Sequence, residues 1–297
     1  MRERAQIRML PDQRRLHMQD GPIDLIVEAF GASDEVHRAY EAAARRFVGV
    51  LDELCSELGR LRARAVVGGQ QPKGRVARRM AAAVAPYAGQ TFITPMAAVA
   101  GAVAEEILDT MTSAARLAKA YVNDGGDIGL QLKPGEQFVI GMVERPERPS
   151  LFGTATITSD EPIRGIATSG WRGRSFSLGI ADAVTVLAGT ASQADAAATI
   201  IANAVDLPGN SRIARVPACS LAPDSDLGEL LVTQEVGELS AEELGWALQA
   251  GMVVAEGLVA EGLIYSAALH LQRETRITGA AMGLHSSDRE TRSLVHA

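Results

Sequence analysis

Residues 118–132, AKAYVNDGGDIGLQL, contain the clearest fold signal in the chain. Two short apolar segments flank the adjacent glycines Gly125 and Gly126, a pattern that is typical of a β-hairpin. The turn sequences KPG, ERPERP and SDEP separate the next strand patterns, which are EQFVIGMV, GTATIT and IRGIAT. Strands that follow one another in this way, in a chain that also contains helix patterns, indicate an α+β fold with mixed or antiparallel sheets packed with helices.

The N-terminal third combines a hairpin pattern with several helix patterns. Residues 14–30 predict two strands joined by the turn sequence DGP. Ser33 is expected to cap a helix, and apolar residues recur at helical spacing as far as Leu61. Further helices are predicted from Arg75, and from Thr94 with a proline at the first helical position.

The C-terminal part shows the same mixture of patterns. In order, they predict a helix over roughly 191–205, a proline-rich loop over 207–227, a strand near 229–234, a helix over roughly 240–260 and a final hairpin. Because no linker divides the chain, we expect one domain over residues 1–297, with a frayed tail from about residue 284.

Composition excludes several classes of protein. The chain has 29 basic and 36 acidic side chains and a formal net charge of −7, which argues against nucleic acid as the main partner. Cys55 and Cys219 are too few for a disulfide scaffold or a zinc cluster. Residues 80–104 carry no charge, but prolines and polar residues interrupt them and alanine inserts weakly into membranes. We therefore expect a cytoplasmic protein with no membrane segment.

The first candidate binding segment is the turn NDGGDI. Its glycines, Gly125 and Gly126, leave backbone N–H groups open to a phosphate or a flavin ring, and Asn123 and Asp127 add polar atoms. Asp127 is able to accept a hydrogen bond from a ribose or a base. The same residues also suit an ordinary hairpin turn.

The second candidate segment is TSGWRGRS, which begins with Thr168, Ser169 and Gly170. Its hydroxyls, glycines and the guanidinium groups of Arg172 and Arg174 suit a diphosphate. A tryptophan within the segment offers a flat surface for an aromatic ring. A surface turn with solvated arginines is the alternative interpretation.

The third candidate segment lies on the helix predicted over roughly 191–205. Asp195 and Thr199 are four residues apart, so their oxygens point the same way and are placed to meet one divalent cation. Alternatively, Ser192 and Asp195 form a variant of the capping box, in which case Asp195 serves only the start of its own helix.

Other polar groups give weaker signals. Asp224 and Asp226 lie in a turn that suits a cation, and the basic residues Arg75, Arg78 and Arg79 are expected to form a solvated helix face. The five histidines lack the spacing of a zinc site. No nucleophile elbow, Walker loop or G-x-G-x-x-G fingerprint is present, so no catalytic residue is assigned.

The order and spacing of the three segments resemble the ApbE-like superfamily, whose best-known members are magnesium-dependent transferases that move FMN from FAD to a protein threonine. NDGGDIG, GIATSG and VTVLAGTASQADAAAT match the family's GGD turn, TSG segment and A-D-A-x-A-T helix, and the resemblance is strongest from about Ala118 to Ala204. Over its whole length the chain looks most like a smaller branch of uncharacterised proteins. The resemblance implies an internally duplicated α+β fold with the ligand between the halves, Mg²⁺ held by Asp195 and Thr199, and FAD or FMN as cofactor.

One departure from the family pattern bears on activity. Flavin transferases carry a H-I-x-D-P-x-T-G stretch between the TSG segment and the metal helix, whereas WRGRSFSLGIADAVTV here has no histidine. Loss of a positioned acid–base group typically costs about 10²–10⁴-fold in rate. The departure argues against flavin transfer even where the pocket is kept.

Three hypotheses follow from these features. The first is a phosphorylated ligand, such as a flavin nucleotide, bound with a divalent cation, with Arg172, Arg174 and the glycine turn at the phosphates. The second is a metabolic enzyme of reductive sulfur or homocysteine metabolism that uses the same pocket, as the resemblance to this branch suggests. The third is a non-catalytic binding or assembly protein whose alanine-rich helices form a homo-oligomer interface.

Overall fold

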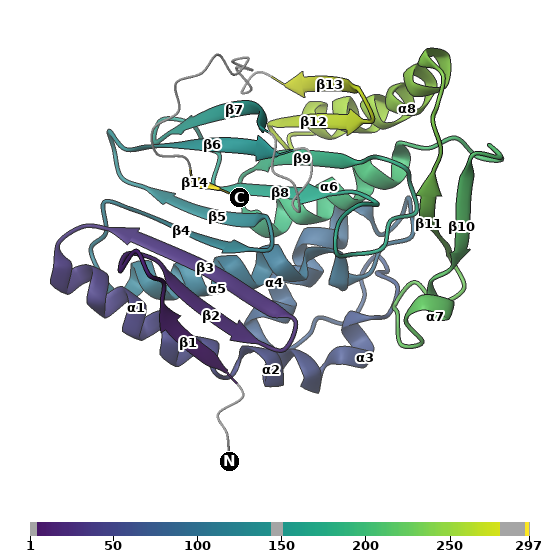
Figure 1. The fold of residues 1–297 in the computed structure, drawn as a ribbon. Helices are drawn as coiled ribbons and strands as arrows, with labels where there is room; N and C mark the ends of the chain where they lie inside the picture. The colour runs from purple at the N-terminus through teal and green to yellow at the C-terminus, as the bar shows by residue number, and fades with distance from the viewer. Residues whose placement is uncertain (1–4, 144–150, 280–294, 297) are drawn as a thin grey trace.

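The computed structural model describes residues 5–143, 151–279 and 295–296. Its central element is a nine-stranded sheet in the order β1-β2-β3-β4-β5-β8-β9-β12-β13, in which every adjacent pair is antiparallel (Figure 1). Its strands are β1 (Gln6–Met9), β2 (Leu16–Asp20), β3 (Ile23–Phe30), β4 (Lys119–Asp124), β5 (Asp127–Leu132), β8 (Gly165–Ser169), β9 (Ala183–Ala188), β12 (Ser266–Leu271) and β13 (Glu274–Gly279).

Helices pack against one face of this sheet. They are α1 (Ser33–Phe47), α2 (Val50–Ser56), α3 (Leu58–Leu61), α4 (Arg75–Val84), α5 (Val99–Ala114), α6 (Ala191–Ala204) and α8 (Ala241–Ala260), with the short helices η1 (Ala85–Tyr87) and η2 (Pro95–Ala98). Alternate strand residues such as Leu25 and Val27 join a core with α1, α4 and α5, whereas Val184 and Val186 join a second core with α6 and α8. The helical face is therefore built from two adjoining cores.

Strands also cover part of the other face. A small sheet in the order β14-β6-β7 consists of β14 (Val295–His296), β6 (Gln137–Val143) and β7 (Leu151–Thr158). Phe138 and Ile157 from this sheet pack against Ile128 and Leu130 of the large sheet. A separate ribbon of β10 (Ile213–Pro217) and β11 (Leu231–Val236) carries α7 (Ala218–Leu221). None of the helices in the described ranges has the length and hydrophobicity needed to cross a bilayer.

The α+β class and most elements expected from the sequence are confirmed. Three expectations were wrong. Ser33 is the first residue of α1 and its side chain makes no cap, because the N-cap position is Ala32. The helix pattern that reaches Leu61 is broken into α1, α2 and α3. The predicted loop over 207–227 contains β10 and α7. The tail predicted to fray from about residue 284 lies almost entirely outside the described residues. The single domain and the internal duplication stay predictions.

Candidate functional site

The N-terminal ends of α5 and α6 meet, and backbone N–H groups at the start of each helix donate to a carboxylate of the other helix. The Asp195 carboxylate accepts a hydrogen bond from the Gly101 backbone N–H at 3.0 Å. In return, the Glu105 carboxylate accepts from the Ser192 N–H and from its hydroxyl, both at 2.8 Å. A Cβ atom on Gly101 would lie 2.3 Å from the Ala191 carbonyl oxygen, so only glycine permits this approach.

The alternative interpretation of Ser192 and Asp195 as a capping box is wrong. The N-cap of α6 is Thr190, whose side chain accepts from the Gln193 N–H at 3.3 Å. Asp195 lies further into the helix and satisfies α5 instead, whose own N-cap, Ala98, has no side chain able to do so. Asp195 is thus a cap, but of a helix that is distant in the sequence.

The glycine turn and the TSG segment lie side by side at the junction of β5 and β8. Gly125 and Gly126 have φ angles of 65° and 113°, and the Asn123 side chain accepts a hydrogen bond from the Gly126 N–H at 2.8 Å, which closes the turn. Asp127 then accepts from the Thr168 N–H at 3.2 Å. Two of the three sequence segments are therefore bonded to each other directly.

Burial raises the pKa of three carboxylates of the site, and neighbouring carboxylates raise it further. Burial raises the pKa of Asp124 to about 7. Burial and the charge of Asp124 raise the pKa of Asp195 to about 7, against hydrogen bonds from the start of α5 that lower it. Burial and the charges of Asp195 and Asp124 raise the pKa of Asp127 well above its usual value. The third sequence segment therefore lies close enough to the first for their charges to interact.

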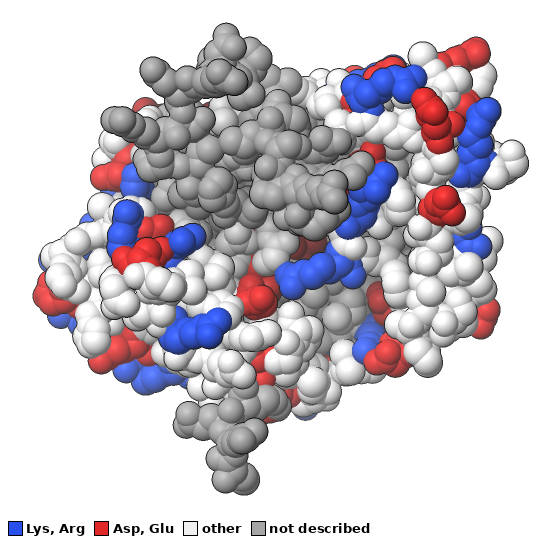
Figure 2. Space-filling view, in the orientation of Figure 1, with Lys and Arg blue, Asp and Glu red and all other residues white. Residues whose placement is uncertain are grey.

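Arg174 lies over the glycine turn. A Cβ atom on Gly125 would come within 1.8 Å of its guanidinium nitrogen Nη2. Its charge lowers the pKa of both Asp124 and Asp127, although less than burial raises them. The side chain is exposed and has no ion pair within the described ranges. Figure 2 shows acidic and basic side chains adjoining near the middle of the face in view.

Arg172 is held differently from Arg174. The Nε atom of Arg172 donates to Oδ1 of the buried Asp182 at 2.5 Å, and the Trp171 indole N–H donates to the same oxygen at 3.0 Å. The guanidinium carbon lies 4.4 Å from the Trp171 ring centroid. Gly170 packs so closely that a Cβ there would lie 2.5 Å from the Asp182 carbonyl oxygen. Asp182 therefore organises this loop, and its contacts give Arg172 a structural role.

Two predicted site residues have less defined surroundings. Ser169 is half-buried at the end of β8, in register with Val184. Thr199 is half-buried on α6, one turn after Asp195. Sequence reasoning missed Asp124 and Asp182. Two signals in the sequence were available for them. Asp124 lies within the NDGGDI turn motif, and Asp182 immediately precedes the buried strand β9.

Several other charged residues have structural partners. Arg75 and Arg79 both form ion pairs with the fully buried Glu106. The expected solvated basic face is wrong for the half-buried Arg79, whereas Arg75 stays exposed. Asp224 pairs with Arg62, and Asp226 accepts from the Thr94 hydroxyl. Across the described ranges, no group of three or more histidine, cysteine or acidic residues has the arrangement needed to hold a metal ion.

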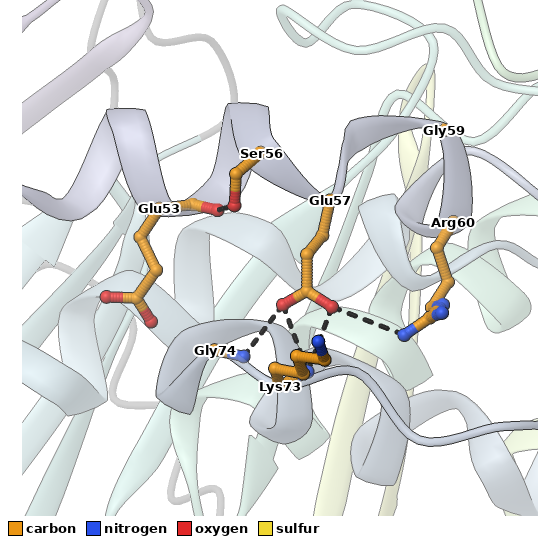
Figure 3. A pocket seen from close by; sticks show the side chains of 7 residues that line it. All are labelled: Glu53, Ser56, Glu57, Gly59, Arg60, Lys73 and Gly74. Carbon is orange, nitrogen blue, oxygen red and sulfur yellow. Dashed lines mark hydrogen bonds and ion pairs between the residues drawn. The ribbon is translucent and has the colours of Figure 1, made fainter.

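A pocket of about 710 Å³ lies away from this site, between α2, α3 and the start of α4 (Figure 3). Its central carboxylate, Glu57, accepts hydrogen bonds from the backbone N–H groups of Lys73 and Gly74. Glu53 accepts from the Arg75 N–H in the same way. These acids cap α4, so the pocket's polar groups already serve the fold.

Residues 7–277 match a family model described as AbpE bacteria. The chain belongs to this family. A UPF0280 protein of Methanosphaerula palustris is 34% identical over 203 residues, which cover 64% of this chain and 74% of that protein. A UPF0280 protein of Methanopyrus kandleri is 38% identical over 128 residues, which cover 43% of this chain and 48% of that protein, so the match spans about half of that relative.

Two solved structures match this chain at low sequence identity and TM-scores below 0.5. Apo flavinyl transferase ApbE of Pseudomonas stutzeri is 11% identical with a TM-score of 0.49, over 92% of this chain and 94% of that chain. A mutant of the flavin transferase ApbE from Vibrio cholerae is 14% identical with a TM-score of 0.39, over 90% and 97% of the two chains.

The role of Asp195 in this AbpE-family chain is testable with two substitutions. Asp195→Ala leaves the Gly101 N–H without its acceptor and is expected to destabilise the protein by about 0.5–2 kcal/mol, the usual cost of a lost cap. Asp195→Asn keeps an acceptor and removes the repulsion from Asp124 and Asp127, so its stability should equal or exceed that of the wild type. Denaturant unfolding in the presence of a chelator measures both, and equal destabilisation by the two variants would contradict the assignment.

Asp124 predicts a pH dependence of stability. A carboxyl whose pKa is raised on folding binds its proton more tightly in the folded state, so stability falls as pH rises from the unfolded pKa towards the folded one. Asp124→Asn removes this loss and should exceed the wild type in stability by at least about 1 kcal/mol at about pH 8, with a smaller difference at about pH 5. Melting temperature is measured against pH for the wild type, for Asp124→Asn and for Asp160→Asn, a control at an exposed position. If the profiles of the wild type and Asp124→Asn are parallel, Asp124 does not titrate in this way.

Proposed function

We propose that this chain binds a phosphorylated ligand of the flavin-nucleotide class together with a divalent cation, where the glycine turn, the TSG segment and α6 meet. The observation that carries the proposal is the convergence of three segments distant in the sequence. Asp127 bonds to Thr168, and the charge of Asp195 on α6 acts on Asp127. Membership of the AbpE bacteria family and the likeness to UPF0280 proteins support a site shared with relatives.

The electrostatics favour a cation at this point. Burial is the main cause of the raised pKa values of Asp124, Asp127 and Asp195, and a bound cation would stabilise their ionised forms. Mg²⁺ suits such a place, because it typically takes one or two carboxylates and completes its shell with water and substrate phosphates.

Asp195 and Thr199 are the proposed protein ligands of the cation. The Asp195 carboxylate accepts from Gly101, which fixes its orientation at the proposed cation site. Thr199 adds a hydroxyl one helical turn away. A bound divalent cation would polarise a phosphoryl oxygen of the ligand.

The glycine turn and Arg174 are the proposed phosphate ligands. Gly125 and Gly126 carry no side chain that would block approach to their backbone, and the exposed Arg174 guanidinium lies directly beside them. Arg172 is left out of this set, since Asp182 and Trp171 hold its guanidinium within the loop. Thr168, Ser169 and Gly170 shape the neighbouring wall.

The proposal concerns binding and assigns no group transfer. The segment from residue 171 to residue 186 contains no histidine that would act as the acid or base of a transfer reaction. Arg172 and Arg174 occupy the corresponding interval. The chain's own residues can bind the phosphates and orient the ligand, and a proton-transfer group would have to be supplied from elsewhere.

Calorimetric titration with FAD and with FMN, each with and without Mg²⁺, tests the proposal. We expect micromolar binding that requires Mg²⁺ and is lost in Asp195→Asn, which keeps the cap of α5 but loses a negative ligand. Absorbance of the untreated protein checks for flavin that is already bound. Absence of binding under all four conditions would refute the proposed ligand class, and binding that ignores both Mg²⁺ and the substitution would refute the cation site.

The two arginines provide a matched pair of variants. Arg174→Gln removes a charged hydrogen-bond donor from the proposed phosphate site, so ligand affinity should fall by about tenfold or more while melting temperature stays unchanged. Arg172→Gln removes the partner of Asp182, so its main effect should be a lower melting temperature. Titration and thermal unfolding of both variants separate the two roles. A loss of affinity in Arg172→Gln together with a lower melting temperature in Arg174→Gln would contradict the proposed roles.

A further inference from the structure

The outer face of α8 exposes apolar side chains that have no partner within the described ranges. Trp246 is 59% exposed and Val253 is 60% exposed. Ala250 and Gly257 are also exposed, and the spacing of these four residues places them in one stripe along the helix. A Cβ atom on Gly257 would meet nothing within 4 Å, so the stripe is open at that end.

The opposite face of α8 already fills the core. Leu244, Leu248 and Ala255 are buried against α6 and the strands. A helix that is hydrophobic on all sides is normally buried on all sides. Large exposed tryptophans are costly in water and are enriched at the centres of protein interfaces. Figure 1 shows α8 at the outer edge of the molecule, next to β12 and β13.

We propose that the α8 stripe is the contact surface for a second copy of this chain, related by a two-fold axis that passes between Ala250 and Val253. In such a symmetric contact the same patch faces itself, and two copies of α8 run antiparallel. Trp246 then lies opposite the partner's Gly257, and Ala250 lies opposite the partner's Val253. The large indole thus meets the position where the helix has no side chain.

Charges beside the stripe are complementary under the same axis. Arg276 on β13 donates to the Gln249 side chain at 2.9 Å, which fixes its guanidinium on one flank of α8. Glu256 is exposed two helical turns further along the same flank. Neither residue has an ion-pair partner in the described part of the chain. The axis brings Glu256 beside the partner's Gln249. Because Arg276 is bonded to Gln249, Glu256 also lies beside the partner's Arg276, and the two form an ion pair across the contact.

On the other flank of α8, the two-fold axis brings together two acidic residues whose repulsion is reduced by an existing ion pair. There the axis brings Glu261 towards the partner's Glu243. The Glu243 carboxylate is already bound by Arg212, at 2.7 and 2.8 Å, and this pairing reduces the repulsion. The 20 residues of α8 form a helix about 30 Å long, which is long enough for a contact of several turns. This inference is independent of the proposed ligand.

Light scattering coupled to size exclusion and sedimentation equilibrium of the full chain test the inference at micromolar concentrations. We expect a dimer, and Trp246→Glu should raise its dissociation constant by at least about tenfold. Val67→Glu, at a position that is 79% exposed and far from α8 in the sequence, should leave the dimer intact. A wild-type monomer at all concentrations, or a dimer unchanged by Trp246→Glu, would overturn the inference.

A charge-reversal pair distinguishes a specific contact from a general loss of folding. Glu256→Arg places two cations together across the axis and should weaken the dimer. Adding Arg276→Glu to the same chain restores opposite charges and should recover the dimer. Circular dichroism verifies that each variant folds. Failure of the double variant to recover association, with both variants folded, would refute the proposed register even if the chain dimerises.

Discussion

The crossing of α5 and α6 is the contact on which the rest of the fold depends. Each helix begins with N–H groups that its own residues leave unsatisfied, and a carboxylate from the other helix accepts from them. Gly101 is required at the crossing point, because any Cβ there would overlap the Ala191 carbonyl. A similar overlap, with the Thr190 carbonyl, makes Gly165 necessary at the start of β8. Helix ends and strand ends therefore approach one another at backbone distance.

This crossing joins the two parts of the molecule. α5 packs beneath β4 and β5, and α6 packs beneath β8 and β9. The two sets of strands meet only along a short stretch, where Ile128 is in register with Ile166 and Gly129 with Gly165. Beyond that stretch the strands separate, and Asp127 bridges them through the Thr168 N–H. The candidate site lies where the sheet's own pairing ends, and there the side chains of Asn123 and Asp127 accept hydrogen bonds from the Gly126 and Thr168 N–H groups.

The sequence predicted those parts of the structure that arise from local interactions. The hairpin at Gly125 and Gly126 and the helix start at Thr94 depend on neighbouring residues, and both were found. Capping was predicted less well. Thr190 and Ser192 are chemically equivalent candidates for the cap of α6, and only the observed backbone selects Thr190. Ser33 lies one residue too late to cap α1, whose N-cap is Ala32. The bond between Asp195 and Gly101 spans 94 positions, and periodicity carries no information about such a pair.

Asp195 shows why a structural role and a binding role need not compete. The N-terminus of α5 provides partial positive charge that fixes one carboxylate oxygen, as the Gly101 hydrogen bond shows. The pKa of Asp195 is still raised to about 7, because burial and the charge of Asp124 outweigh the hydrogen bonds from the start of α5. The helix end therefore orients the carboxylate without neutralising it. A divalent cation would stabilise the ionised form of this oriented carboxylate, so the capping role is compatible with the proposed site.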